Sequence, residues 1–308
     1  MTETPLKYRN KEEYIQPARG GHVACPGCAM VLALRWFMRA IGEKVTFVSA
    51  PGCIMPVAVT PELITKHDGE YIPWLWVPFG SAAICAGGLK AAFMARGETE
   101  IEVVVWVGDG ATFDIGFGGL SGAAERNEDI IYVCYDNEGY QNTGNQRSSA
   151  TPWGAITTTN PIPAPKMERK KAITMLMAEH AVPYVATATV SYPDDLIRKV
   201  QKARNISGFR FLHILTPCPT GWMFPSQWTV KLSRLAVETK IFPLFEVEDG
   251  VVFTINKEPE GIPVEEYVRI QGRYKHLTSE QIAKLQKDAD EKWDRLRWLA
   301  RYKKPSEA

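Results

Sequence analysis

The sequence has no excess of charge of either sign and no long apolar run. Its 36 Lys and Arg residues almost balance 35 Asp and Glu residues, which leaves a net charge of +1. This balance gives no indication of a nucleic-acid or membrane surface, and the short basic run from Lys166 to Lys171 is interpreted as a solvated face. No stretch is long enough to span a membrane, and the N-terminal MTETPLKYRNKEEY has no signal-peptide core. We therefore expect a cytosolic protein.

Cysteine is scarce as well, with six residues in a chain of 308. So few cysteines in a cytosolic protein argue against a disulfide framework and favour metal binding or catalysis for some of them. Cys85 and Cys134 fall inside apolar segments, and we interpret both as small core residues.

Strands and helices alternate along most of the chain. Strands are expected at residues 44–50, 102–107, 129–137, 184–190 and 209–215, and helices at 29–42, 80–97, 118–127, 171–180 and 193–205. Because several strands are continuous apolar runs, the pattern predicts an α/β fold with a doubly wound, mostly parallel sheet covered on both faces. Ligands bind such sheets at the carboxyl ends of the strands, where PGC, GDG, DN and TPCP all fall.

The C-terminal region differs in character from the rest. Thr278 and Gln281 form a plausible capping box for a charged helix that extends to about Arg301, with an apolar side that includes Trp293 and Trp298. We assign residues 1–250 to a cofactor-binding domain and residues 251–308 to an extension. This helix could pack on its own domain or on a partner subunit.

The motif HVACPGC places Cys25 and Cys28 two residues apart. A redox-active pair would normally follow a strand, and the preceding QPARGGHVA has no strand character. Cys53 and Cys218 lie in loops at the same predicted end of the sheet, so four thiolates could converge there. Four such ligands suit Zn²⁺ or a [4Fe–4S] cluster. One CxxC with two separate cysteines favours the cluster, and zinc stays open.

The GDG motif at Gly108–Gly110 becomes informative because Asp136 and Asn137 follow the next strand. Mg²⁺ prefers oxygen ligands and often shares a diphosphate, and Asp109, the Asn137 amide and a backbone carbonyl just beyond could supply three. The glycines allow a sharp turn and a close approach to phosphate. This spacing is the fingerprint of thiamine-diphosphate enzymes. The following EGYQNTGNQ would cover the cofactor, with Tyr140 and Asn142 facing it.

Several motifs together resemble one family. GHxxCxGC, the later GC at Cys53, GDG with DIGFGGLSG, YDNEGYQNTGNQRSSATPWGA, LTPC and LAVETKIFPLFEVEDG are similar to the β subunit of the 2-oxoacid:ferredoxin oxidoreductases. The similarity extends from about His22 to the C-terminal helix. It implies an oxidative decarboxylation of a 2-oxoacid to CO₂, with electrons passed to ferredoxin and, in most members, an acyl group passed to coenzyme A.

The resemblance also implies the ligands of each cofactor. Cys25, Cys28, Cys53 and Cys218 would bind a [4Fe–4S] cluster, while Asp109, Asn137 and the Gly139 carbonyl would bind Mg²⁺. Thiamine diphosphate would contact a set of loop residues around these ligands, with Asn142 near the reacting carbon: Cys53, Gly108, Asp109, Gly110, Ala111, Asn137, Gly139, Tyr140 and Asn142.

One catalytic part is missing from the chain. Thiamine enzymes activate the cofactor with a glutamate from a separate pyrimidine-binding domain, and only about a hundred residues precede GDG here. The resemblance therefore implies an α-type partner subunit that supplies this glutamate, together with γ- or δ-type subunits that carry further clusters.

Departures from the family pattern concern the substrate. Pyruvate-type members read CxGCGE and TGCLE where this chain reads CPGCAM and APGCIM, and the stretch TPELITKHDGEYIPWLWVPFGSA also differs. Loss of two carboxylates beside the cofactor would ease binding of a more anionic substrate. We therefore expect a 2-oxoacid other than pyruvate, such as oxalate, a branched-chain or an aromatic acid.

Two other hypotheses compete with this reading. One is a thiamine enzyme half-site without redox function and with zinc at the cysteines; the other is a non-catalytic paralogue, against which the intact Asp109 and Asn137 argue. The histidines and two tryptophans receive mostly structural interpretations. His22 either forms a hydrogen bond near the cluster or cofactor or is structural. Trp74 and Trp76 either shape the substrate side or belong to the aromatic core, and we favour the core. The other histidines are assigned structural roles: His67, His180, His213 and His276.

Overall fold

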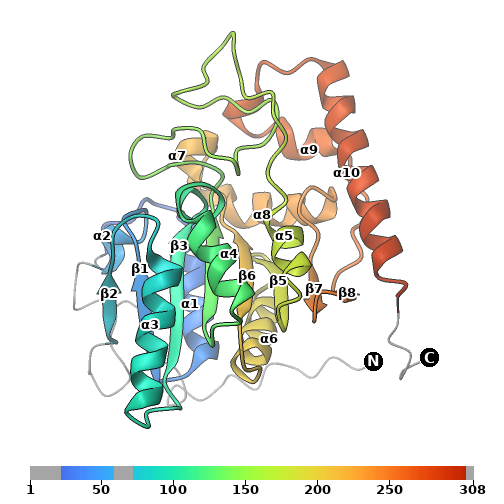
Figure 1. Cartoon of the computed structure of the whole chain (residues 1–308). Helices are drawn as coiled ribbons and strands as arrows, with labels where there is room; N and C mark the ends of the chain where they lie inside the picture. The colour runs from blue at the N-terminus through green and yellow to red at the C-terminus, as the bar shows by residue number, and fades with distance from the viewer. Residues whose placement is uncertain (1–21, 59–71, 303–308) are drawn as a thin grey trace.

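A single eight-stranded sheet forms the centre of the computed structural model, which describes residues 22–58 and 72–302 (Figure 1). The strand order is β2-β1-β3-β4-β6-β5-β7-β8. The strands are β1 (Val45–Ser49), β2 (Trp74–Trp76), β3 (Glu102–Gly108), β4 (Ile131–Asp136), β5 (Tyr184–Thr189), β6 (Arg210–Leu215), β7 (Phe245–Glu248) and β8 (Val252–Ile255).

The first six strands are parallel, and the last two form an antiparallel edge. β7 pairs with β5, and β8 pairs with β7. The predicted doubly wound, mostly parallel sheet is confirmed. The short edge strands β2, β7 and β8 were not predicted from the sequence, because three or four residues carry little periodic signal.

Helices cover both faces of the sheet, which gives three layers (Figure 1). One face carries α1 (Ala29–Ile41) and α6 (Pro193–Arg204), and the other carries α3 (Ala82–Ala95), α4 (Phe117–Glu125) and α5 (Ile173–Glu179). Successive β3 side chains alternate between two buried clusters: Val104 and Trp106 pack with α1 and α6, while Val103 and Val105 pack with α3 and α4. Both faces of the strand are therefore apolar, as parallel strands require.

A third apolar cluster lies beyond the sheet and is built largely from the C-terminal half. The remaining elements are α2 (Met55–Ala58), η3 (Gly110–Ile115, a π-helix), α7 (Pro219–Trp222), η4 (Ser226–Trp228), α8 (Thr229–Glu238), α9 (Val264–Val268), η5 (Gly272–Tyr274) and α10 (Ser279–Leu299). The capping box at Thr278 and Gln281 is present. On α10, Leu285 and Trp293 are buried against this same chain, whereas Trp298 is 67% exposed.

The extension is continuous with the rest of the structure, since β8 belongs to the central sheet. The domain boundary at residue 250, and a contact of α10 with a partner subunit, stay predictions. Part of the TPELITKHDGEYIPWLWVPFGSA stretch, including His67, lies outside the described residues. Trp74 stacks on Phe47 with ring centroids 4.4 Å apart, which agrees with its assignment to the core.

The interpretation of the run Lys166–Lys171 as a solvated face is wrong for three of its lysines. Lys166 is 1% exposed and donates to the Thr151 carbonyl, and Lys171 donates to the Phe113 carbonyl. Lys170 forms ion pairs with two buried carboxylates. Backbone carbonyls and carboxylates that lie far away in the sequence compensate these charges, and a local charge pattern cannot reveal them.

Candidate cofactor and metal site

The predicted loops meet at the carboxyl ends of four adjacent strands. Cys53 follows β1, Asp109 follows β3, Asn137 follows β4 and Cys218 follows β6, and these strands are neighbours in the order β1-β3-β4-β6. A cavity of about 240 Å³ opens at this edge. Every residue that the resemblance assigns to thiamine diphosphate contributes to its lining: Cys53, Gly108, Asp109, Gly110, Ala111, Asn137, Gly139, Tyr140 and Asn142.

The glycines of GDG pack closely against tyrosine rings. A Cβ atom at Gly110 would lie 2.2 Å from Tyr140 Cε1, and one at Gly108 would lie 3.1 Å from Tyr135 Cε2. Tyr140 is held from its other end, because its hydroxyl donates to Asp114 Oδ2 at 3.2 Å. Any side chain at position 110 would therefore displace Tyr140 from the cavity wall.

Asp109 is a fully buried carboxylate that forms no ion pair among those found in the described residues. Its Oδ2 accepts a hydrogen bond from Ser148 Oγ. Burial, followed by the negative charge of Asp136, raises the pKa of Asp109 well above its ordinary value. A cation beside Asp109 would reverse this effect, because an adjacent positive charge favours the ionised form.

Three oxygen atoms meet at the floor of the cavity. The Asn137 amide oxygen lies 2.9 Å from Asp109 Oδ1 and 3.0 Å from the Gly139 carbonyl oxygen, so it faces only acceptors. An octahedral Mg²⁺ with ligands at about 2.1 Å would place neighbouring oxygens about 3.0 Å apart. If the amide were rotated by 180°, its nitrogen would donate hydrogen bonds to Asp109 Oδ1 and to the Gly139 carbonyl. With the amide oxygen facing inward, the three oxygens instead suit a cation.

The other end of the Asn137 amide faces sulfur. Its Nδ2 donates to Cys53 Sγ at 3.5 Å. The neighbouring Cys218 Sγ accepts from the Gly221 backbone N–H at 3.3 Å. The two predicted constellations are thus adjacent in space, although they lie far apart in the sequence.

The CPGC turn is docked onto the start of α8. Cys28 N donates to Cys25 O at 3.1 Å, and Thr229 Oγ1 donates to Gly27 O at 2.6 Å. Gly27 has a φ of +72°, and a Cβ there would lie 2.5 Å from the Ser226 carbonyl oxygen. The turn therefore needs glycine both for its conformation and for its close approach.

The four loop cysteines are electrostatic neighbours. Burial, followed by thiolate charge at Cys218 and Cys28, raises the pKa of the Cys53 thiol. Burial also raises the pKa of Cys218 to about 11, and Cys28 and Cys25 act in the same direction. However, among residues 22–58 and 72–302, no group of three or more His, Cys, Asp or Glu side chains is arranged so that it could hold a metal ion.

Cys134, Cys85 and His213 lie apart from this group. Cys134 is buried within β4, and Cys85 packs partly buried against the core, in agreement with their assignment. His213 is buried between Asp136 and Thr174. His22 lies beside Cys25 in the wall of a separate surface cavity of about 340 Å³.

Several residues around the site were not identified from the sequence. Trp222 Nε1 donates to the Asn137 carbonyl at 2.8 Å, Ser148 Oγ donates to Asp109 Oδ2, and Lys170 and Arg273 form ion pairs with Glu138. Ser148 lies in the motif YDNEGYQNTGNQRSSATPWGA without being singled out there, and the basic run that contains Lys170 was misinterpreted. Arg273 stands more than a hundred residues from the loop and carried no signal at all.

The fold and the site define a thiamine-diphosphate-binding α/β domain. A family model described as "Thiamine pyrophosphate enzyme, C-terminal TPP binding domain" matches residues 55–214. The pyruvate synthase subunit PorB of Methanothermobacter marburgensis is 46% identical over 290 residues, which cover 93% of this chain and 98% of that protein. The ketoisovalerate oxidoreductase subunit VorB of Pyrococcus furiosus is 43% identical, over 91% of this chain and 92% of that protein.

A solved structure of 2-oxoglutarate:ferredoxin oxidoreductase from Magnetococcus marinus agrees with these relatives. It is 26% identical, with a TM-score of 0.56 and a coverage of 70% of each chain. The chain belongs to the β subunits of the 2-oxoacid:ferredoxin oxidoreductases, and it is therefore one subunit of an enzyme with partner subunits. No helix in the described part of the chain is long and apolar enough to cross a membrane.

Proposed function

We propose that this subunit binds Mg²⁺ and thiamine diphosphate in the cavity and a [4Fe–4S] cluster beside it, and that its enzyme oxidatively decarboxylates a 2-oxoacid. When bound, thiamine diphosphate would supply the decarboxylation chemistry and the cluster would accept electrons for ferredoxin. The observation that carries the proposal is the convergence of oxygens from Asp109, Asn137 and Gly139. This donor set fits a hard divalent cation that shares a diphosphate.

The residues of the cavity also fit the cofactor's surroundings. Gly108 and Gly110 bring backbone close to the cavity, while Phe79 and Tyr140 form an aromatic wall with centroids 6.1 Å apart. Asn142 lines the same space, and we assign it the position nearest the reacting carbon. In this arrangement the chain orients the cofactor and excludes water from one side.

The sulfur chemistry favours the cluster over a single zinc ion. Structural zinc sites typically combine one CxxC pair with another, whereas here one CxxC pair, Cys25 and Cys28, is combined with the separate Cys53 and Cys218. A [4Fe–4S] cluster takes four such thiolates, one on each iron atom. Burial raises the pKa values of the Cys28, Cys53 and Cys218 thiols and so disfavours their thiolates, and the positive iron centres would offset that cost.

The exposed side of the site supports an α-type partner. Ile84 and Ile115 are 56% and 59% exposed, and Ile115 lies against Gly80, next to the cavity residue Phe79. We propose that the α-type subunit covers these isoleucines and brings the glutamate that activates the pyrimidine ring. Further proposed partners are γ- or δ-type subunits with additional clusters, and ferredoxin.

We propose the class of the substrate, a 2-oxoacid, and not the particular acid. The curated relatives are named for pyruvate and ketoisovalerate, and the sequence argument favours oxalate. The residues behind that argument, Met30 and Met55 with their neighbours Ala29 and Ile54, do not line the cavity. Oxalate is therefore a candidate from sequence alone, and coenzyme A would be needed only if the substrate leaves an acyl group.

The proposal is tested by anaerobic purification of the complex with its co-expressed partners. Pyruvate, oxalate, 2-oxoisovalerate and an aromatic 2-oxoacid are added in turn, without coenzyme A, while the visible spectrum is recorded. We expect broad absorption at about 400 nm, which is typical of iron–sulfur thiolate sites. This absorption should bleach when one of the acids is added. A colourless protein that contains zinc would instead support a non-redox thiamine half-site.

A further inference from the structure

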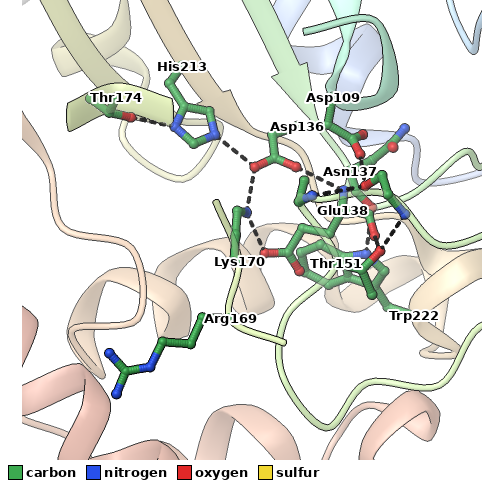
Figure 2. A network of polar contacts seen from close by, with 12 residues as sticks. Asp109, Asp136, Asn137, Glu138, Thr151, Arg169, Lys170, Thr174, His213 and Trp222 are labelled. Atoms are coloured by element: carbon green, nitrogen blue, oxygen red, sulfur yellow. Dashed lines mark hydrogen bonds and ion pairs between the residues drawn. The ribbon is translucent and has the colours of Figure 1, made fainter. Parts of the chain in front are cut away.

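Four charged side chains lie together directly behind the loop that presents the metal ligands: Asp136, Glu138 and Arg273 are buried, and the Lys170 side chain is 19% exposed. Figure 2 shows Asp136, Glu138 and Lys170. We call Asp136, Glu138, Lys170 and Arg273 the charge cluster. Lys170 Nζ lies 2.5 Å from Asp136 Oδ2 and 2.7 Å from Glu138 Oε1. Arg273 Nη2 lies 2.7 Å from Glu138 Oε2 on the other side. Glu138 is therefore held between two cations.

The cluster is electrically balanced. Its two carboxylates face two cations, and burial lowers the pKa of the adjacent His213, which leaves that ring neutral near pH 7. His213 Nε2 then donates to Asp136 Oδ2 at 2.7 Å, while Nδ1 accepts from Thr174 Oγ1 at 2.7 Å. A charge-balanced, ion-paired cluster can persist in the interior, whereas removal of one member leaves an uncompensated charge.

Arg273 contacts Glu138, which follows Asn137 in the loop, and Trp222, which donates a hydrogen bond to the Asn137 backbone carbonyl. Its guanidinium carbon lies 3.8 Å from the centroid of the Trp222 ring, and Trp222 Nε1 donates to the Asn137 carbonyl at 2.8 Å. Arg273 Nε is itself fixed by Gln271 Oε1 at 2.8 Å. A residue of the C-terminal region thus contacts the loop directly at Glu138 and indirectly, through Trp222, at Asn137.

The loop needs such support because its backbone is strained. Glu138 has a φ of +62°, a left-handed conformation that is costly for a residue with a Cβ. Its N–H donates to Asp136 Oδ1 at 2.9 Å, and its carbonyl accepts from Thr151 Oγ1 at 2.8 Å. This turn brings the Asn137 side chain and the Gly139 carbonyl to the same side, toward Asp109.

We propose that Lys170 and Arg273 are positioning residues for Mg²⁺ and its diphosphate: they hold Glu138 in the left-handed turn that directs the oxygens of Asn137 and Gly139 at Asp109. This inference rests on the proposed function, because it assigns the metal to that oxygen triad. Neither cation touches the proposed metal, so both act through Glu138. Loss of such outer contacts typically weakens metal affinity about 10-fold to 100-fold.

The test measures metal affinity rather than turnover. Mn²⁺ is titrated into the anaerobic complex with thiamine diphosphate present, and free Mn²⁺ is followed by its electron paramagnetic resonance signal. The variants are Arg273→Met, Lys170→Met and Glu138→Gln, with Arg273→Lys as the charge-preserving variant. We expect the first three to bind Mn²⁺ about 10-fold to 100-fold more weakly, and Arg273→Lys to recover much of the loss.

Arg210→Met is the matched control. Arg210 is 1% exposed and lies 2.7 Å from Glu102 Oε2, so it resembles Arg273 in burial and pairing. It begins β6, opposite Ile131 at the start of β4, which places it at the other end of the sheet from the site. We expect this variant to lower the melting temperature and leave Mn²⁺ affinity within about 2-fold of wild type, because it does not touch the loop.

A double variant separates positioning from general damage. If Arg273 acts through Glu138, Glu138→Gln with Arg273→Met binds Mn²⁺ no more weakly than the worse single variant. Equal affinities for Arg273→Met, Arg210→Met and wild type would overturn the inference and leave the proposed function intact. A wild-type complex that binds thiamine diphosphate without any divalent ion would overturn both. Glu138→Gln, which keeps the shape of the side chain, provides the same test if Arg273→Met does not fold.

Discussion

Asn137 Nδ2 donates a hydrogen bond to Cys53 Sγ across 3.5 Å, while the oxygen of the same amide faces Asp109 at 2.9 Å. One side chain therefore joins the proposed magnesium site to a proposed cluster ligand. Under the proposed function, the electron donor and the electron acceptor would share a wall of the cavity. Asn137 would then contribute to both cofactor binding and electron transfer, and the two proposed roles can be measured separately.

Asn137→Ala is expected to weaken metal binding and to lower the reduction potential of the cluster. The amide oxygen is a ligand in the first case, and in the second the hydrogen bond to sulfur stabilises the more negative, reduced cluster. A redox titration followed by electron paramagnetic resonance measures the potential. Asn142→Ala, in the same cavity, is the control for general effects of truncation. An unchanged potential in Asn137→Ala would contradict a cluster ligand at Cys53.

Asp109→Asn is expected to stabilise the protein without cofactors and to abolish binding of Mg²⁺. Burial penalises the Asp109 carboxylate, whereas an amide could accept from Ser148 and donate to the Asn137 oxygen. The gain should be about 1–3 kcal/mol in the free energy of unfolding, measured by urea denaturation of the protein without cofactors. A destabilised variant that retains normal Mg²⁺ affinity would contradict the assignment.

Serine substitutions at the four loop cysteines are expected to reduce the iron content and the absorption near about 400 nm. Each of Cys25, Cys28, Cys53 and Cys218 supplies one proposed iron ligand, and a serine hydroxyl replaces a thiolate poorly. Cys85→Ala is the control, because Cys85 packs against the core away from this group. Iron and acid-labile sulfide are assayed after anaerobic purification. Normal iron content in all four variants would exclude a cluster on these residues.

Aspartate at Ile84 or Ile115 is expected to weaken assembly with the α-type subunit by at least about 10-fold, because a charge would replace an apolar contact at the interface. Both side chains are more than half exposed, so the fold of the chain alone should be unaffected. Met94→Asp is the matched control, since Met94 is 50% exposed near the other end of α3. Co-purification and analytical ultracentrifugation measure assembly. Equal assembly for all three variants would place the α-type subunit elsewhere.

Sequence patterns were sufficient where a motif directly follows a regular strand. The apolar runs before GDG and before Asp136 identified β3 and β4, and the position of the motifs then followed from the parallel topology. The same reasoning brought Cys53 and Cys218 to one edge of the sheet.

The supports of the site were not predictable in this way. Lys170 comes from the long segment between β4 and α5, which has no helix or strand, and Arg273 comes from η5 in the C-terminal region. Their partners are fixed by tertiary packing rather than by spacing. The π-helix at Gly110–Ile115 was also missed, because it depends on the tight fit of Gly116 against the Ala111 carbonyl.

The most direct test is a crystal structure of the assembled enzyme grown anaerobically with thiamine diphosphate, with anomalous data collected at the iron and zinc edges. The account predicts an iron signal enclosed by Cys25, Cys28, Cys53 and Cys218, and a light divalent ion held by Asp109, Asn137 and the Gly139 carbonyl. A zinc signal at the cysteines, or a diphosphate bound without any ion at Asp109, would contradict it.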